Sequence, residues 1–491
     1  MALSRATGSA VAARPQSPRA VPNDPAWTDY FRRLVLEPAP RGGRRAFLVD
    51  DIATSLGSAI HRDARVLEVG TGRGDILARL PNTVRHGIDL LPEAVEAARE
   101  RDSRMRVDLG DALTMELGEK YDAIIADRIV HSITDVQRLL ENLAHHLTPD
   151  GRIYLTCFNY MWSVPLAIAA MMGIVERRAT EENWLDEATF ASLFALTDLE
   201  PIHADDRILL PADVPLVSDL LNKVAAKVRP FRFGSLYRIY TLRPRVASRP
   251  ARPKVTVVVP ARNEAGNVRA AVSRTPSMGA GTEIIFVEGG SSDDTWATIE
   301  RVMAEYSGPL ELRACRQRGK GKADAVREGF ARARGDLLMV LDADLTVPPE
   351  ELPKFFDAMI SGRTDYVQGN RMVYPMEDDA MRFLNKLGNA GFARLFTFLL
   401  DQPIKDTLCG TKVIWKRDYE RLAANRDYFG DFDPFGDFDL IFGARKLQLK
   451  IMEIPIRYRS RTYGETNISR FRHGLILAKM SLIASRKLKF V

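Results

Sequence analysis

The sequence predicts two successive domains of the α/β class, each built on a mostly parallel sheet. Short apolar runs alternate with helical stretches in both halves, which is the pattern of strands joined by crossover helices. Between the halves, Arg243 to Lys254 reads RPRVASRPARPK and has no apolar periodicity, as expected of a linker. The 491 residues therefore divide into a domain over 26–242, a linker over 243–254 and a domain over 255–491.

The composition is that of an ordinary globular protein. Hydrophobic residues make up 46% and charged residues 27%, so neither half needs a membrane or a disulfide framework to fold. The three cysteines, Cys157, Cys315 and Cys409, are scattered and lack the spacing of metal ligands. This favours free thiols in a reducing cytoplasm and argues against structural zinc.

The N-terminal 25 residues are expected to form a disordered tail. Met1 to Asp24 is rich in Ala, Pro, Ser and Arg and lacks the apolar core of a secretory signal. A transit peptide would share that composition, so an organellar address stays open as the alternative.

The C-terminal end carries concentrated positive charge. From Arg457 to Val491 there are nine Arg or Lys residues and one acid, Glu465, within a chain of net charge +6. This suits an anionic membrane surface or phosphorylated substrates. Nucleic acid is disfavoured as a partner, because no aromatic platform or docking motif accompanies the charge.

No segment reaches the ~20 apolar residues of a membrane span. The nearest are Met161 to Val175 and Gly474 to Ala484. The segment from Phe471 to Leu488 can lie flat at an interface or pack as a C-terminal helix on its own domain, and both interpretations stay open. Among its apolar residues are Phe471, Leu475, Leu477, Met480, Leu482, Ile483 and Leu488.

Four short strands are expected in the first half, at Val66 to Val69, His86 to Leu90, Ala123 to Ala126 and Ile153 to Thr156. The first ends in a turn with three glycines, Gly70, Gly72 and Gly74, and a helix is expected from Asp75. Glycines there let the backbone approach a ligand closely, and a helix N-terminus offers free N–H groups. The second strand ends at Asp89, about 20 residues further on, the offset at which an acid reaches ribose hydroxyls.

Together with GDA at Gly110 to Ala112 and LTPDGRIYLT at Leu147 to Thr156, these motifs resemble those of class I S-adenosylmethionine-dependent methyltransferases, over Ala26 to Leu242. The resemblance implies a Rossmann-like fold with S-adenosylmethionine as cofactor. A nicotinamide-binding domain is the alternative, which the acid before the glycines, Glu68, and the late PDG turn disfavour. The implied cofactor residues are Glu68, Gly70, Gly72 and Gly74 for the methionine and ribose part, Asp89 for the ribose hydroxyls and Asp111 for the adenine amine.

His131 is the candidate general base for methyl transfer. It lies on the loop Asp127 to Asp135, after a strand, at the carboxyl edge where such sites occur. A structural or exposed histidine is the alternative. No Asn-Pro-Pro-Tyr-type motif is present, which argues against methylation of a base or amide nitrogen, and a domain that binds without catalysing stays open.

Three strands of the second half end in acidic motifs. Val255 to Val259 runs into PARNE, Ile284 to Val287 into EGGSSDDT with a helix expected near Asp294, and Leu337 to Leu341 into Asp342-Ala-Asp344. Carboxylates at three strand ends predict an edge that binds a nucleotide and a metal, because paired aspartates suit a hard divalent cation beside a diphosphate.

This constellation resembles the family 2 glycosyltransferases of GT-A fold, from Val255 to about Leu488. The motifs GNR, DTLCGTKV and RTYGETNIS, starting at Gly369, Asp406 and Arg461, are similar to those of dolichol-phosphate mannosyltransferases and dolichyl-phosphate glucosyltransferases. In one place the chain departs from the pattern: EGG at Glu288 to Gly290 stands where Asp-Asp-Gly is usual, which leaves the selected base open.

The resemblance implies a role for each matching position. The ribose and base are held by Pro260, Arg262 and Glu264, and Glu288 and Asp293 lie close to the nucleotide. Mg²⁺ or Mn²⁺ is held by Asp342 and Asp344. The acceptor phosphate and the leaving diphosphate are surrounded by Arg371, Arg382 and Arg461. Arginine suits the last role, since it is permanently charged and grips phosphate through two parallel hydrogen bonds.

The nature of the acceptor decides whether a protein base is needed. A lipid phosphate is already ionised, so inverting attack on the anomeric carbon needs positioning and neutralisation of the leaving group. A sugar hydroxyl would need a carboxylate such as Asp437 or Asp439, although these can equally cap the helix expected over Leu440 to Ala444. Phe383 to Leu400 can seat on the bilayer or form a core helix.

The expected protein is bifunctional, cytoplasmic and peripheral at the cytosolic membrane face. It moves one sugar from a nucleotide-sugar to polyprenyl phosphate and methylates an acceptor that the sequence does not identify. The absence of a Gln-x-x-Arg-Trp motif disfavours a processive synthase. The alternative is a glycosyltransferase for a soluble acceptor, with the first domain serving as a scaffold.

Overall fold

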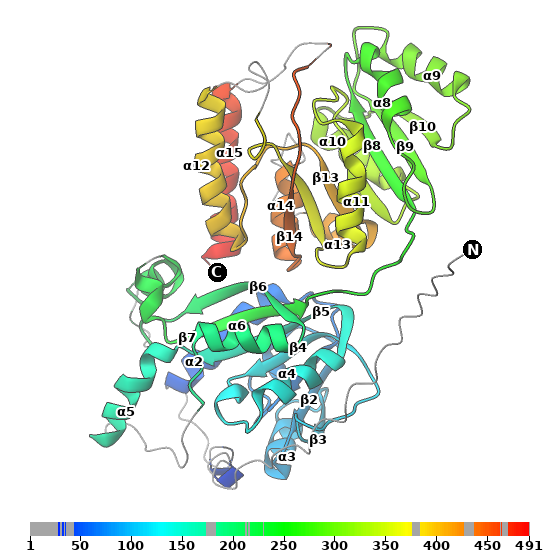
Figure 1. Cartoon of the computed structure of the whole chain (residues 1–491). Coiled ribbons are helices and arrows are strands. Elements are labelled where there is room, and N and C mark those ends of the chain that lie inside the picture. Colours follow the sequence, from blue (N-terminus) through cyan, green and yellow to red (C-terminus); the bar gives the residue numbers. More distant parts are fainter. Residues whose placement is uncertain are drawn as a thin grey trace, which may run out of the picture.

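The computed structural model describes residues 44–172, 183–211, 217–228, 230–375, 383–426, 437–461 and 470–490, with the isolated positions 28, 29, 32, 33, 35, 214 and 463. Two α/β units, one for each half of the chain, lie one above the other (Figure 1). The tail predicted at the N-terminus lies outside these residues.

The first unit contains a seven-stranded sheet in the order β3-β2-β1-β4-β5-β7-β6. Strands β1 to β5 pair in parallel, and β7 runs antiparallel between β5 and β6. Its strands are β1 (Val66–Val69), β2 (Arg85–Asp89), β3 (Arg106–Leu109), β4 (Tyr121–Asp127), β5 (Leu147–Phe158), β6 (Leu199–Arg207) and β7 (Tyr237–Pro244). Its helices are α2 (Arg44–Ala59), α3 (Pro92–Arg101), α4 (Val136–His145), α5 (Ser163–Met171), α6 (Glu187–Leu196) and α7 (Val217–Asp219).

The second unit also has a seven-stranded sheet, in the order β10-β9-β8-β11-β13-β12-β14. The first four of these strands are parallel, and β13 pairs antiparallel with β11 and β12. Its strands are β8 (Val255–Ala261), β9 (Thr282–Glu288), β10 (Glu311–Arg316), β11 (Leu337–Val340), β12 (Tyr366–Asn370), β13 (Lys412–Trp415) and β14 (Ile451–Pro455). Its helices are α8 (Val268–Arg274), α9 (Thr295–Glu305), α10 (Lys322–Arg332), α11 (Leu352–Ile360), α12 (Phe383–Leu400), α13 (Lys416–Ala424), α14 (Asp437–Lys446) and α15 (Arg470–Ala484).

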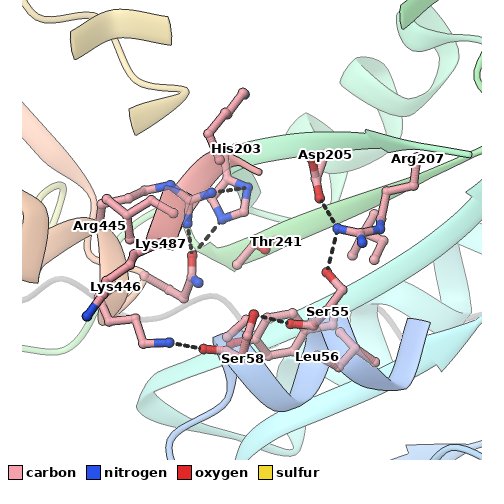
Figure 2. Close-up of a pocket in the computed structure, with 16 residues that line it drawn as sticks. Ser55, Leu56, Ser58, His203, Asp205, Arg207, Thr241, Arg445, Lys446 and Lys487 are labelled. Carbon is pink, nitrogen blue, oxygen red and sulfur yellow. Dashed lines mark hydrogen bonds and ion pairs between the residues drawn. The ribbon is translucent and has the colours of Figure 1, made fainter. Parts of the chain in front are cut away.

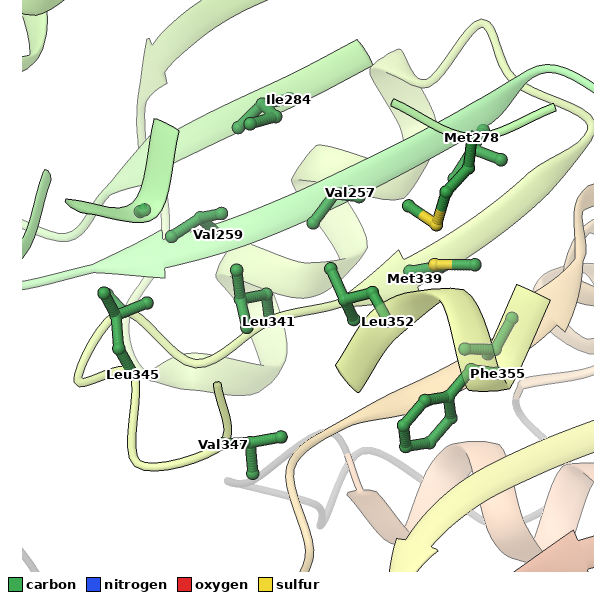
Figure 3. Packing of buried hydrophobic residues seen from close by; sticks show 14 of the residues in the cluster. Val257, Val259, Met278, Ile284, Met339, Leu341, Leu345, Val347, Leu352 and Phe355 are labelled. Atoms are coloured by element: carbon green, nitrogen blue, oxygen red, sulfur yellow. The ribbon is translucent and has the colours of Figure 1, made fainter. Parts of the chain in front are cut away.

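The central strands are apolar because helices cover both faces of each sheet. In β8, Val257 and Val259 face one buried cluster and Val258 faces the other, as the two-residue period of a strand requires. Figure 3 shows the first cluster, in which these valines pack toward Met339 on β11 and Leu352 on α11. Both faces of β8 are therefore anchored, which fixes the position of the residues that follow it.

The mixed α/β architecture of both halves confirms the predicted fold class. The predicted strands all exist, and each end lies no more than six residues from its expected position. The helix expected from Asp75 is wrong: only a 3₁₀ turn, Leu77–Arg79, follows the glycines. Pro81 explains the difference, since the residue before a proline is pushed out of helical conformation and too few residues remain for an α-helix.

Helices α12 and α15 lie side by side on the second unit (Figure 1). Phe396, Leu399 and Leu400 of α12 are fully buried, which confirms the core-helix interpretation of that segment. In α15, Leu477 is buried whereas Leu475 is 74% exposed and Leu482 56% exposed. The helix thus packs on its own domain with one face and presents leucines to the outside with another. Within the described ranges, no helix combines the length and the apolar character needed to cross a membrane.

The two units meet through a buried ion-pair network centred on Asp365. Its carboxylate accepts hydrogen bonds from Arg152 on β5, at 2.8 Å, and from Arg249, and Arg243 lies 3.6 Å away. Burial opposes ionisation of Asp365, but the three guanidinium groups outweigh it and hold its pKa below the usual value. Two of these arginines lie in the predicted linker, whose first residues belong to β7. Ion pairs to Asp365 therefore hold part of the linker between the two units.

Candidate active sites

The second sheet brings three acidic strand ends to one edge. Strands β8, β9 and β11 are parallel, so the residues after them emerge on the same side. The chain leaves β8 toward β9 and β10 and returns to the other side of β8 as β11. In open α/β sheets, ligands bind where the strand order reverses in this way, outside the carboxyl ends of the two central strands.

Arg461 joins two of these strand ends. One terminal nitrogen of its guanidinium donates to Asp344 Oδ2 at 2.7 Å, and the other lies 3.4 Å from Glu264 Oε1. Asp344 Oδ1 accepts from the backbone N–H and the hydroxyl of Thr346, at 3.1 and 2.8 Å. Burial raises the pKa of Glu264, which the hydrogen bond from Asn267 and the charge of Arg461 oppose. Three predicted site residues from distant parts of the chain are thus in direct contact.

Asp342 is held by Lys322, whose ammonium lies 2.5 Å from Oδ1. Burial opposes ionisation, but Lys322 outweighs it, so the pKa of Asp342 lies below its usual value. Gly410 passes directly over this carboxylate, and any side chain at position 410 would overlap Asp342 Oδ2 and the Lys322 ammonium. The loop after Asp406 therefore closes against the aspartate only because residue 410 is glycine.

Hydrogen bonds tie together the remaining nucleotide-side residues. Glu288, at the end of β9, is buried and accepts from the Ser291 N–H at 2.5 Å. Asp293 accepts from the Thr295 N–H at 3.0 Å and lies 3.3 Å from the Tyr463 hydroxyl. Burial would raise the pKa of Asp293, but the hydrogen bonds from Thr295 outweigh burial and lower the pKa. Pro260 is half-buried at the end of β8, and Arg262 is exposed beside it.

Arg371 is engaged by a carboxylate in this structure. Its Nε and one terminal nitrogen donate to the two oxygens of Asp406 at 2.7 and 2.8 Å, and its backbone N–H donates to the same group at 3.0 Å. The guanidinium also lies over the Tyr458 ring, 4.9 Å from its centroid. This buried, two-point pair fixes the start of the loop that carries Gly410. The predicted phosphate contact of Arg371 remains a prediction, and Arg382 lies outside the described residues.

The candidate bases are at the start of α14. Asp437 is its first residue, and Asp439 is buried and accepts from Arg327 at 3.2 Å and from Arg426 at 3.0 Å. Two guanidinium groups on one carboxylate fix its orientation. The role of either aspartate as a base remains a prediction.

The acidic pair Asp342 and Asp344 fits a hard divalent cation in its chemistry. Carboxylate oxygens are the ligands that Mg²⁺ and Mn²⁺ prefer, and the two groups lie one residue apart at the same edge. Lys322 and Arg461 currently supply the compensating positive charge. Among the side chains that the structure describes, no three or more of His, Cys, Asp and Glu are grouped as a metal site.

In the first sheet, the glycine turn and the second strand end also meet. Asp89 Oδ2 accepts from the Gly72 N–H at 2.7 Å, and Oδ1 accepts from the Leu91 N–H at 3.0 Å. Gly72 has a φ of 54°, and a side chain there would meet nothing within 4 Å, so open space lies beside the turn. Asp111 follows β3 and is close to Asp89, because the Gly110 N–H donates to the Asp89 carbonyl at 2.8 Å.

Glu68 carries an unsatisfied polar atom under the same turn. Its side chain is buried, and its Oε2 has no hydrogen-bond partner. Burial raises the pKa of Glu68 well above its usual value, and the charge of Asp127 adds to the effect. A buried acceptor without a donor costs free energy, so a ligand that offers an N–H group fits this position.

His131 is buried with both ring nitrogens engaged. Nδ1 lies 2.8 Å from the Asn183 carbonyl and therefore donates, while Nε2 accepts from the Phe158 N–H at 2.8 Å. The ring also packs against Phe158 and Trp184. This arrangement suits the structural alternative, because taking up a proton at Nε2 would break a backbone hydrogen bond. The role of His131 as a base remains a prediction.

Lys322 and Gly410 belong to the second site but were missed in the sequence. Lys322 begins α10 after β10, so a fourth strand end followed by RGKGK was the available signal. Gly410 offered none, because its need for glycine comes from the approach of a loop to a strand 68 residues earlier in the chain.

Two family models match separate parts of the chain. Residues 256–423 match the model of the glycosyl transferase family 2, and residues 60–192 match a methyltransferase domain model. The chain is 30% identical over 218 residues to the dolichyl-phosphate hexose transferase of Haloferax volcanii, covering 44% of this chain and 85% of that one. It is 30% identical over 221 residues to the dolichol-phosphate mannosyltransferase of Pyrococcus furiosus, covering 44% of this chain and 59% of that relative.

A third relative, an undecaprenyl-phosphate 4-deoxy-4-formamido-L-arabinose transferase of an Enterobacter species, is 34% identical over 222 residues, covering 44% of this chain and 63% of the relative. The chain thus spans less than two thirds of the length of two of these three relatives. Since the second-half match extends over most of the Haloferax enzyme and the first half matches a separate model, the chain belongs to the family 2 glycosyltransferases and carries a methyltransferase domain ahead of its glycosyltransferase domain.

Proposed function

We propose that the second domain transfers a single sugar from a nucleotide-sugar to polyprenyl phosphate, with Mg²⁺ or Mn²⁺ bound by Asp342 and Asp344. The observation that carries this proposal is the contact of Asp344, Glu264 and Arg461 at the carboxyl ends of β8 and β11. The three relatives named above are polyprenyl-phosphate sugar transferases by their descriptions, which supports the choice of acceptor.

The charges at this edge of the second sheet are arranged for departure of a diphosphate. A divalent cation held by Asp342 and Asp344 would neutralise the leaving diphosphate. Lys322 and Arg461, now paired with those aspartates, are positioned to turn to phosphate oxygens. The acceptor phosphate is already ionised, so the chain needs to align it rather than deprotonate it.

Transfer of radiolabel from UDP-glucose, GDP-mannose and related donors into organic-extractable polyprenyl phosphate tests this function. Asp344→Asn should lower metal-dependent product at least 100-fold, because it removes a carboxylate from the metal and from Arg461. Asp357→Asn, on the exposed side of α11, is the matched control and should stay within twofold of wild type. Label appearing only in water-soluble acceptors would refute the lipid acceptor and make Asp437 and Asp439 the bases to test.

The first domain is proposed to bind S-adenosylmethionine at the glycine turn and to transfer its methyl group. Three observations support binding: the open space beside Gly72, the hydrogen bond from Gly72 to Asp89, and the unsatisfied Oε2 of Glu68. Calorimetric titration of the cofactor into the full chain tests it. Asp89→Asn should weaken binding about tenfold, since it removes a charged acceptor, and a wild-type chain that does not bind would favour the scaffold alternative.

A cytosolic membrane surface is proposed as the working location. The exposed Leu475 and Leu482 of α15 lie in a segment with basic residues, which is the composition of interfacial helices. A second apolar surface lies on α5, where Val164, Ile168 and Met171 are exposed and residues 159–172 carry no charge. Sedimentation with vesicles containing phosphatidylglycerol should recover the chain, and recovery should fall with salt.

A further inference from the structure

A small cavity lies between the two domains (Figure 2), and none of its lining residues belongs to either candidate active site. Its volume is about 50 Å³, enough for a few water molecules or one tetrahedral oxyanion. The first domain contributes the C-terminal end of α2 and the outer strands β6 and β7, and the second contributes the end of α14 and residues 487–489. Neither domain encloses the cavity alone.

Arg445 is a buried cation of the cavity wall, with a side chain that is 8% exposed. One of its terminal nitrogens donates to Gln448 Oε1 at 2.8 Å, and the other lies 3.6 Å from Asp401 Oδ2. Its Nε is buried and has no hydrogen-bond partner. A buried N–H donor of a charged group costs folding free energy when it has no acceptor. The position of Arg445 Nε therefore favours a ligand with oxygen acceptors.

His203 next to it does not compensate this charge. Its Nε2 lies 2.6 Å from Gln448 Oε1, which already accepts from Arg445, so Nε2 donates. Its Nδ1 therefore keeps the lone pair and faces Arg445 at 3.5 Å. Burial and the charge of Arg445 lower the pKa of His203 well below its usual value, which keeps the ring neutral.

Basic residues outnumber acidic ones around the cavity. Among the residues that line the cavity, five are basic, Arg207, Arg445, Lys446, Lys487 and Lys489, and one is acidic, Asp205; Asp51 and Asp401 pair with Arg207 and Lys489 from outside the lining. Burial together with Arg445 lowers the pKa of Lys446 to about 8, as expected where positive charge is in excess. Ser55, Ser58 and Thr241 lie on the first-domain side, where the Ser58 hydroxyl donates to the Ser55 carbonyl at 2.8 Å and the Ser55 hydroxyl accepts from Arg207 at 3.3 Å. The side chains that the cavity offers to an anion are therefore its cations.

We propose that this cavity is a phosphate-binding site at the domain interface, distinct from the nucleotide and acceptor sites. The chemistry it recognises is a phosphate group carrying at least two ionised or acceptor oxygens, whose charge balances the excess cations and one of whose oxygens accepts from Arg445 Nε. A bound phosphate contacts both domains and stabilises their association.

Calorimetric titration of sodium phosphate into the full chain tests the proposal, at constant ionic strength and without nucleotide-sugar, metal or S-adenosylmethionine. Saturable binding near one phosphate per chain is expected. Lys446→Met with Lys487→Met should weaken it at least tenfold, because the double variant removes two cations and leaves the buried Arg445 in place. Lys354→Met, an exposed lysine on α11, is the control and should bind as wild type does.

Vesicles with and without phosphatidic acid distinguish a free phosphate from a lipid headgroup as the source. Binding of phosphatidate vesicles that the double variant loses, with weak binding of free phosphate, would support the site and identify the headgroup. Absence of saturable binding of either probe, or binding that the double variant leaves unchanged, would overturn the proposal. Since neither reaction is assayed, this result is independent of the proposed function.

Discussion

At the scale of single residues, three basic groups at the second site are already paired with carboxylates. Lys322 lies on Asp342, Arg461 on Asp344 and Arg371 on Asp406. Any phosphate that enters must exchange these partners, and a cation on the aspartates would release two of them. Each of these three pairs is neutral as a whole without ligands, which limits the free-energy cost of burying its charges.

Gly410→Ala tests the close approach of the loop to Asp342. A methyl group at this position overlaps the carboxylate and the Lys322 ammonium, so the loop or the aspartate must move. Sugar transfer should fall at least tenfold, because displacement by about 1 Å at a reacting centre costs up to 100-fold. Gly388→Ala, on α12 where a side chain meets nothing within 4 Å, should leave the rate within twofold in the same assay.

Asp406→Ala tests the buried pair with Arg371. Leaving this guanidinium buried without its carboxylate should lower the free energy of unfolding by about 3–5 kcal/mol, measured by urea denaturation. Glu305→Ala breaks the exposed pair with Arg269 and should cost less than about 1 kcal/mol. Equal effects of the two variants would show that the buried pair does not stabilise the loop.

The sequence predicted the members of these sites better than their contacts. Asp342, Asp344 and Glu264 follow apolar strands, and the parallel sheet brings such positions together, so their proximity could be predicted. Which partner each takes depends on loops that return from far along the chain. Arg461 reaches Asp344 across 117 positions, and no local pattern records such a contact.

At the scale of elements, α15 illustrates why the sequence left two interpretations open. Its apolar residues are too numerous for one buried stripe, and the structure places Leu477 inside and Leu475 and Leu482 outside. One face of the helix is packed and another is exposed. The spacing of apolar residues in the sequence therefore could not distinguish a core helix from an interfacial one. The missing helix after Gly74 has a different origin, since Pro81 limits its length and a strand-like continuation outcompetes it.

Substitutions on the two faces of α15 should therefore have opposite effects. Leu477→Ala should lower the free energy of unfolding by about 2–5 kcal/mol, because it opens a cavity in the core, and should leave vesicle binding unchanged. Leu475→Glu with Leu482→Glu should change stability by less than about 0.5 kcal/mol and reduce vesicle sedimentation at least tenfold. Undiminished sedimentation of the double variant would exclude α15 from the membrane surface.

At the scale of the whole molecule, acids are concentrated at the domain interface. Besides Asp365, the interface contains Asp150, which accepts from Arg249 and Arg417, and Asp418, which is 2% exposed. Burial raises the pKa of Asp418 to about 6, and the charges of Asp150 and Asp365 add to the effect. The interface thus tolerates a neutral Asp418 better than an ionised one.

This gives a pH dependence with a definite sign. A carboxyl with a raised pKa in the folded state stabilises the fold fully below its unfolded value near 4, and this contribution is lost as pH rises through about 6. Asp418→Asn should unfold like wild type at pH 4 and be about 2–3 kcal/mol more stable at pH 8. Urea denaturation at both values checks this, with Asp357→Asn as the exposed control that should show no such difference.

The fastening of residues 243–249 between the domains has a practical consequence for dissecting the two activities. A fragment ending at Leu242 would lose Arg243 and Arg249 and expose Arg152, and one beginning at Val255 would keep Asp365 without any of its three guanidinium partners. Each half made alone would expose charged side chains, without their partners, on a surface that is buried in the intact chain. Inactivity of an isolated half could then result from the loss of these ion pairs and not from a missing catalytic group. Each reaction therefore has to be abolished by a point substitution in the intact chain.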